Sequence, residues 1–170
     1  AQMRLRAAQR CGTSWDMSSS DHIPKAALYL GLAGVLPFAY AALCLVIPSA
    51  APLGDWLLPN FAPDIMLRNY GIVILCFMAG VIWGFAVHAP SPQMMGYGLA
   101  ASTIPALAAF FLGFGPTHQA LPILSMGFLA LLPLDAWAMR AGLAPNWWLR
   151  LRGLLSSLVI LCLTLGVFYA

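Results

Sequence analysis

Tyr70-Gly-Ile-Val-Ile-Leu-Cys-Phe-Met-Ala-Gly-Val-Ile-Trp-Gly84 runs for fifteen residues without a charged side chain. Extended to residues 68–88, this segment is long enough to cross a bilayer, because a helix needs about 20 mainly apolar residues to span the hydrocarbon core. Four further stretches qualify, at about residues 26–47, 94–114, 121–139 and 151–169. The sequence therefore predicts an all-α membrane protein built as a bundle of about five transmembrane helices.

The composition supports a membrane environment. Of the 170 residues, 62% are hydrophobic and 8% are charged, and the mean hydropathy is +0.86. A soluble domain carries roughly 25% charged residues. The net charge of +3 is too small, and its eight basic residues too scattered, for a nucleic-acid-binding protein. We expect membrane lipids and other membrane proteins as partners, and no nucleic acid.

The basic residues predict which end of each helix faces inward. With five crossings, seven of the eight fall on the side of the N-terminus, and only Arg68 falls on the other side. Basic residues near membrane segments are retained on the cytoplasmic or matrix side, so the N-terminus is predicted inside and the C-terminus outside. Tryptophan side chains are enriched at the interface between the membrane and water. Those expected as anchors are Trp137, Trp147 and Trp148 at the inner surface and Trp56 at the outer one. The seven inner basic residues are Arg4, Arg6, Arg10, Lys25, Arg140, Arg150 and Arg152.

Residues 1–23 are predicted to form a basic arm that precedes the transmembrane domain at 24–170. The part before Asp16 holds three arginines and no acid, which is typical of a mitochondrial presequence or its remnant. The alternative is an upstream extension before a bacterial start at Met17. The first interpretation favours the mitochondrial inner membrane, and the second favours a bacterial inner membrane.

Three stretches together carry a family resemblance: Pro24-Lys-Ala-Ala-Leu-Tyr-Leu-Gly-Leu-Ala-Gly-Val-Leu-Pro-Phe38, the segment at 70–84, and the tail. The tail reads Leu134-Asp-Ala-Trp137 and then Ala141-Gly-Leu-Ala-Pro-Asn-Trp-Trp-Leu-Arg-Leu-Arg152. From residue 24 to residue 168, the chain resembles a functionally uncharacterised family of small proteobacterial inner-membrane proteins that includes human mitochondrial transmembrane protein 69. The resemblance implies a five-helix bundle in an energy-transducing membrane. It implies no catalytic residues.

Small residues suggest where helices make contact. Gly80 and Gly84 have GxxxG spacing, and Gly98 and Ser102 form a similar pair on the next helix. Small residues one turn apart let two backbones approach closely. Packing within the bundle is the favoured interpretation, and docking of another protein is the alternative.

Two ion pairs are expected from the few charges. Asp135 lies near the inner end of the fourth helix, where a carboxylate is costly unless paired or near water. Arg150 or Arg152, folding back from the following loop, is its expected structural partner, and a proton relay is the alternative. Asp64 and Arg68 are four residues apart and can pair on one helical face. Otherwise, Arg68 reaches the outer interface or meets an anionic lipid or partner.

The sequence contains no catalytic or phosphate-binding signature. We predict no catalytic residues, no cofactor and no metal, and we interpret the three histidines as ordinary interfacial side chains. The favoured function is a non-catalytic accessory or assembly subunit of a larger inner-membrane complex, such as a respiratory complex. The alternative is a carrier or channel for a small solute or ion, with helices broken at Pro105 and Pro133. A membrane-embedded enzyme is the least favoured.

The predicted topology can be tested by labelling from each side of the membrane. A single cysteine placed after Tyr169, in a variant whose four natural cysteines are replaced, should react with an impermeant maleimide only from the outer side. A cysteine beside Lys25 should react only from the inner side. Labelling of the C-terminal cysteine from the inside would contradict the number of helices or their orientation.

Overall fold

The computed structural model describes residues 22–47 and 62–169. Within these residues there are five α-helices and no strand, and all five helices are long and apolar enough to cross a membrane. The all-α five-helix prediction is therefore confirmed. Most of the basic arm (residues 1–21) and Trp56 lie outside the described residues. The helices are α2 (Lys25–Val46), α4 (Pro63–Ala86), α5 (Pro92–Gly113), α6 (Thr117–Arg140) and α7 (Trp148–Tyr169).

Two helices begin earlier than their hydropathy indicates. α4 begins at Pro63 and not near Arg68, and α6 begins at Thr117 and not near residue 121. Proline is favoured in the first turn of a helix, and Asp64 beside it places a negative charge near the positive end of the helix dipole. These first turns are more polar than the spans that follow, so a hydropathy window places the start too late.

The internal prolines do not break their helices. α5 continues through Pro105, and α6 continues through Pro122 and Pro133. Membrane helices tolerate proline where neighbouring groups or local adjustment satisfy the freed backbone. The interruptions at Pro105 and Pro133 that belong to the carrier alternative are therefore not found in α5 and α6.

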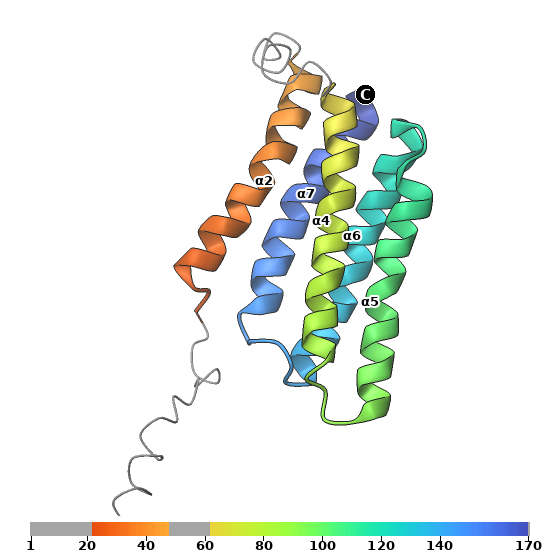
Figure 1. Cartoon of the computed structure of the whole chain (residues 1–170). Coiled ribbons are helices and arrows are strands. Elements are labelled where there is room, and N and C mark those ends of the chain that lie inside the picture. Colours follow the sequence, from red (N-terminus) through yellow and green to blue (C-terminus); the bar gives the residue numbers. More distant parts are fainter. Residues whose placement is uncertain (1–21, 48–61, 170) are drawn as a thin grey trace, which may run out of the picture.

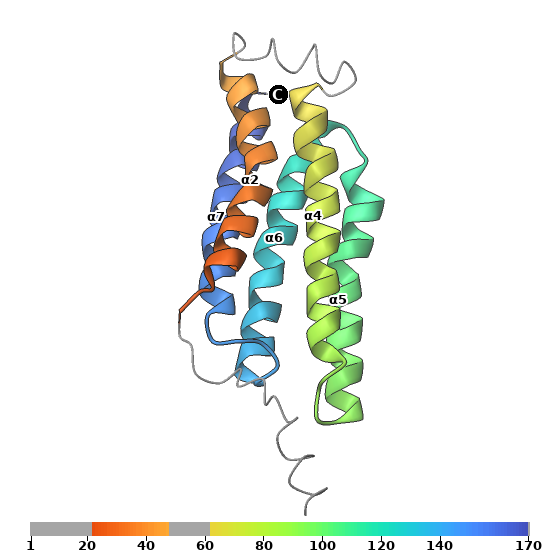
Figure 2. The same ribbon diagram turned by 60° about the vertical axis from the view of Figure 1, so that its left-hand side comes forward.

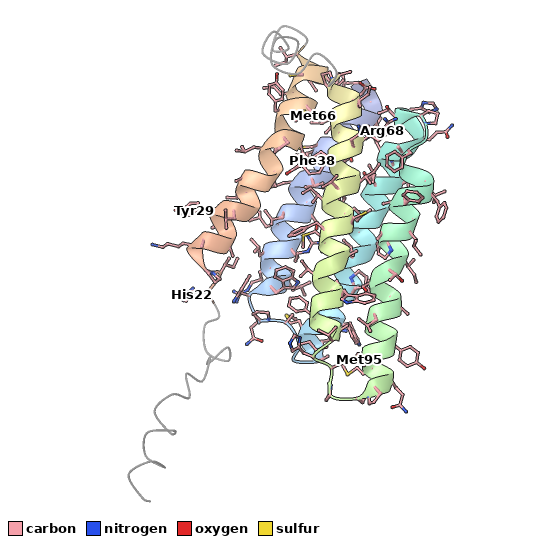
Figure 3. All side chains as sticks on the ribbon, viewed as in Figure 1. His22, Tyr29, Phe38, Met66, Arg68 and Met95 are labelled. Atoms are coloured by element: carbon pink, nitrogen blue, oxygen red, sulfur yellow. The ribbon has the colours of Figure 1, made fainter. Side chains whose placement is uncertain are left out.

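The helices alternate in direction, so Lys25 and Tyr169 lie at opposite ends of the bundle (Figures 1 and 2). α4 packs against α2, α5 and α6, while α7 packs against α6 and α2. Phe38 of α2 lies where this helix contacts α4 (Figure 3). The centroid of its ring is 4.9 Å from the ring centroid of Tyr70 on α4 and 6.3 Å from that of Phe128 on α6. The outer faces carry large apolar side chains such as Tyr97 and Phe168, as expected for surfaces in contact with lipid.

Glycines permit the closest helix contacts inside the bundle. A Cβ atom on Gly98 of α5 would lie 2.6 Å from the Cβ of Ala86 and 2.8 Å from Cη2 of Trp137. The Cβ of Ala86 cannot move without its backbone, so only glycine fits at this crossing of α5 with α4 and α6. Ser102, one turn later, is also buried, at 3% exposure. The Gly98 and Ser102 pair thus faces the interior.

Replacing Gly98 by leucine should therefore separate α5 from its neighbours. We expect a destabilisation of about 1–3 kcal/mol or more, the usual range for an overpacked core, measured as a lower midpoint of thermal unfolding in detergent. Gly96 is the matched control, because it is exposed on the same helix and has nothing within 4 Å of its Cβ position. Equal stability of Gly98→Leu and Gly96→Leu would contradict this packing.

Candidate functional site

A buried carboxylate joins α6 to α7 at the end of the bundle that is predicted to face inward (the inner end). Asp135 of α6 is 1% exposed. Its Oδ2 accepts a hydrogen bond of 2.9 Å from Nε of Arg152, and its Oδ1 accepts one of 2.7 Å from Nε1 of Trp148. Arg152 is itself 3% exposed. Of the two partners expected for Asp135, the structure brings Arg152 to it, whereas Arg150 is exposed.

The turn between the two helices makes this contact possible. Gly142, with φ of 69°, follows the last residues of α6, and its N–H donates to the carbonyl of Met139 while that of Leu143 donates to Ala138. This is a Schellman arrangement, which requires a left-handed residue at the position of Gly142. It ends α6 sharply and lets the first turn of α7 return alongside Asp135.

The energetics of the ion pair between Asp135 and Arg152 explain why the loss of either partner should destabilise the bundle. Asp135 and Arg152 balance each other's charge, and the Trp148 indole satisfies the second carboxylate oxygen. Removing one partner of a buried ion pair typically costs about 3–5 kcal/mol, because the other charge is left uncompensated. A structural role for Asp135 is therefore consistent with the geometry.

Trp148 has a role that the sequence did not suggest. It was expected only as an interfacial anchor, yet it is half-buried, bonded to Asp135, and packed edge-on against Phe85 at 5.3 Å. The signal in the sequence is its place four residues before Arg152 on α7, because residues four apart share a helical face and can meet the same carboxylate. Trp147 contacts the ring of Trp148, and Trp137 packs over Gly98.

The charges at the outer end of α4 do not pair with each other. Arg68 donates from Nη1 to the carbonyl of Gly115 at 3.1 Å and from Nε to Asn69, while Asp64 accepts from the Thr117 hydroxyl at 3.1 Å. No Asp64–Arg68 salt bridge is found in residues 22–47 and 62–169. The expected pair was wrong because the α5–α6 turn offers each charge a polar partner. Arg68 lies at the end of the bundle opposite His22 (Figure 3).

Gly80 and Gly84 lie on the outside of α4. Both are exposed, and nothing lies within 4 Å of a Cβ built on either. The opposite face of the helix, with Ala79, Ile82 and Ala86, is the one buried in the bundle. The favoured interpretation, packing within the bundle, was therefore wrong for this pair, although it holds for Gly98 and Ser102.

Histidines are exposed at both ends of the bundle. His22, His88 and His118 lie apart on different segments, and the ring Nδ1 of His88 is 3.0 Å from the carbonyl oxygen of Gly84. Among the residues that the structure describes, no three His, Cys, Asp or Glu side chains gather where they could hold a metal ion. The Asp135 cluster and the open face of α4 are thus the features with functional potential.

The family described as "Protein of unknown function (DUF3429)" matches residues 23–168. The chain belongs to this family. Transmembrane protein 69 of Xenopus tropicalis is 32% identical over 161 residues, which cover 88% of this chain and 56% of that protein. Transmembrane protein 69 of Mus musculus is 32% identical over 141 residues, covering 80% and 52%. This DUF3429 chain spans about half the length of the curated relatives it matches, and no solved structure matches it. It is a multi-pass membrane protein, and the predicted family resemblance is confirmed.

Replacing Asp135 by asparagine should destabilise the DUF3429 bundle by about 3–5 kcal/mol, because Arg152 loses its counter-charge in a buried site. Thermal unfolding and the amount of folded protein in membranes would measure this. Exchanging the two charges, as Asp135→Arg with Arg152→Asp, should restore part of the loss.

Asp64→Asn is the matched control, because Asp64 accepts from a neutral hydroxyl that asparagine can also accept from. It should change stability little. If Asp135→Asn were as stable as the wild type but abolished a proton or solute flux, the relay interpretation would replace the structural one.

Proposed function

We propose that this protein is a non-catalytic accessory or assembly subunit of a larger inner-membrane complex. It docks through the exposed face of α4 that carries Gly80 and Gly84 and points away from the rest of the bundle. The single observation that carries the proposal is the open Gly80–Gly84 face, where nothing lies within 4 Å of either Cβ position. The proposed occupant is one transmembrane helix of another subunit. We propose the mitochondrial inner membrane and a respiratory complex as the setting, with a bacterial inner membrane as the alternative.

Helix association in lipid supports this choice of face. Lipid tails are as apolar as side chains, so two helices associate through close van der Waals contact, which small residues allow. A two-glycine gap on α4 admits a second backbone where any larger residue would hold it away. The flanking Phe77 and Trp83 are 65% and 45% exposed, and aromatic residues are enriched in protein interfaces.

The inner end of this face is also hollowed. Gly84 lines a groove of about 540 Å³ between the end of α4 and the α6–α7 turn, together with His88, Gly142 and Leu143. A groove beside the glycine pair supports a partner that crosses the membrane along α4 and contacts the inner turn. The carrier alternative has less support, because α5 and α6 are continuous where interruptions were expected.

The test is native purification of a tagged chain in a mild detergent, followed by mass spectrometry of the co-purifying membrane proteins. Gly84→Leu places a branched side chain in the proposed contact and should reduce recovery of those proteins by about tenfold or more, the scale of a lost interface hot spot. Its thermal stability and its amount in the membrane should stay close to wild type, because the Cβ position is open.

Gly96→Leu is the matched control, since Gly96 is also exposed and open but has no glycine four residues away. It should keep the partners. Full recovery with Gly84→Leu would reject α4 as the docking face. Absence of any co-purifying membrane protein with the wild type would reject the accessory function itself.

A further inference from the structure

An apolar cavity lies between α2, α4 and α7 in the inner half of the bundle. Its volume is about 130 Å³, and its walls include Gly34 of α2, Met78 of α4 and Val159 of α7. A second cavity, of about 450 Å³, shares part of these walls and extends to Trp147 and Trp148 at the inner interface. The two cavities share Gly31, Phe77, Met78, Arg152 and Leu155 as lining residues, and together they are called the groove. The N-terminal end of α2, which begins near these cavities, diverges from α4 (Figure 1).

Two residues that line the 130 Å³ cavity, Arg152 and Ser156, each carry a buried hydrogen-bond donor without a partner. Nη2 of Arg152 and Oγ of Ser156 are buried and make no hydrogen bond within residues 22–47 and 62–169. Arg152 is 3% exposed and Ser156 is 1% exposed. They stand four residues apart on α7, so they share one face of the helix. A buried donor left unsatisfied is costly, and two on one cavity wall indicate a ligand with an acceptor oxygen.

The charge balance restricts the chemistry of that acceptor. Asp135 already compensates the guanidinium through Nε of Arg152, so an added anion would bring an unbalanced charge into a low-dielectric site. A neutral carbonyl oxygen accepts hydrogen bonds without adding charge. The apolar walls beyond Ser156, formed by Val35, Phe128 and Val159, suit a hydrocarbon chain attached to that carbonyl.

The depth of the donors agrees with a membrane lipid. Arg152 is the fifth residue of α7, so it lies about 6 Å along the axis from the start of the helix. This places it near the boundary between the headgroup region and the hydrocarbon core, where the ester carbonyls of membrane lipids are found. Val159 lies about 10 Å further along α7, toward the middle of the bilayer.

We propose that the groove binds an acyl chain of a membrane lipid, whose carbonyl oxygen accepts hydrogen bonds from Nη2 of Arg152 and from the Ser156 hydroxyl. The chain then follows α7 toward Phe128 and Val159. The headgroup stays at the inner interface beside Trp147. This site borders the proposed docking face on α4 but does not include Gly80 or Gly84.

The test uses a phosphatidylcholine with a diazirine in the middle of one ester-linked acyl chain. The purified full chain in detergent micelles is photolabelled at increasing probe concentration, and the labelled residues are mapped by mass spectrometry. We expect saturable labelling of the α2 and α7 residues that line the groove. Ser156→Ala should weaken the apparent affinity by about two- to tenfold, the value of one hydrogen bond, without lowering the melting temperature.

One further variant and two control variants separate binding from folding. Gly34→Val should block the groove, because its Cβ position has only Tyr70 Oη near it, at 4.0 Å, and Gly153→Val is its control at an open site outside the groove. Ser157→Ala is the control for Ser156, because the exposed Ser157 hydroxyl donates to its own helix at Gly153. Both controls should label like the wild type.

Competing ligands identify the part of the lipid that binds. An ether-linked phosphatidylcholine, which lacks the carbonyl, should compete several-fold less well than its ester-linked counterpart. Equal competition would overturn the carbonyl contact. Competition by a free fatty acid alone would assign the same site to a free acyl chain instead of an intact lipid. Labelling that is non-saturable, or unchanged by both Ser156→Ala and Gly34→Val, would overturn the site.

Discussion

The ion pair between Asp135 and Arg152 is the constraint on which the inner half of the bundle depends. It joins two helices that are adjacent in the chain, and it fixes the rotation of α7 against α6. Apolar contacts alone would not fix this rotation, because α7 is apolar on most of its surface. With Arg152 directed to Asp135, Leu155 lies against Gly31 of α2, where its Cδ1 is 2.6 Å from the Cβ position of that glycine. The pair thus determines which face of α7 the first helix meets.

In lipid, the size of side chains decides which helices approach closely, since there is no hydrophobic force between them. The glycines of this chain divide accordingly. Gly71, Gly98, and Gly166 meet neighbouring side chains at 3.0 Å or less from a built Cβ, whereas Gly80 and Gly84 meet nothing within 4 Å. The first group explains the internal packing. The second group remains on α4 as a surface that the bundle itself does not use.

The five helices could be predicted from hydropathy because crossing a membrane requires long apolar segments, and Asp135 could be given a basic partner because a buried carboxylate needs one. Which face of each helix is buried in the bundle and which faces lipid could not be predicted. Lipid-facing and core-facing residues are both apolar, so the period that separates them in a soluble helix is weak here. For this reason the prediction that Gly80 and Gly84 pack inside the bundle was wrong. Trp148 was missed because its bond to Asp135 depends on the turn at Gly142.

The docking face and the lipid groove meet on α4. Val81 lines both the groove beside Gly84 and the cavity that reaches Trp148, so a single helix turn separates the two surfaces. A partner helix seated on Gly84 would cover part of the groove mouth, and a bound acyl chain would then lie at the border of the interface. Close packing at the glycines leaves little room for lipid there. The proposed lipid groove between α2, α4 and α7 has room for a chain. A docked helix would therefore retain the lipid in the groove and exclude it from the glycine face.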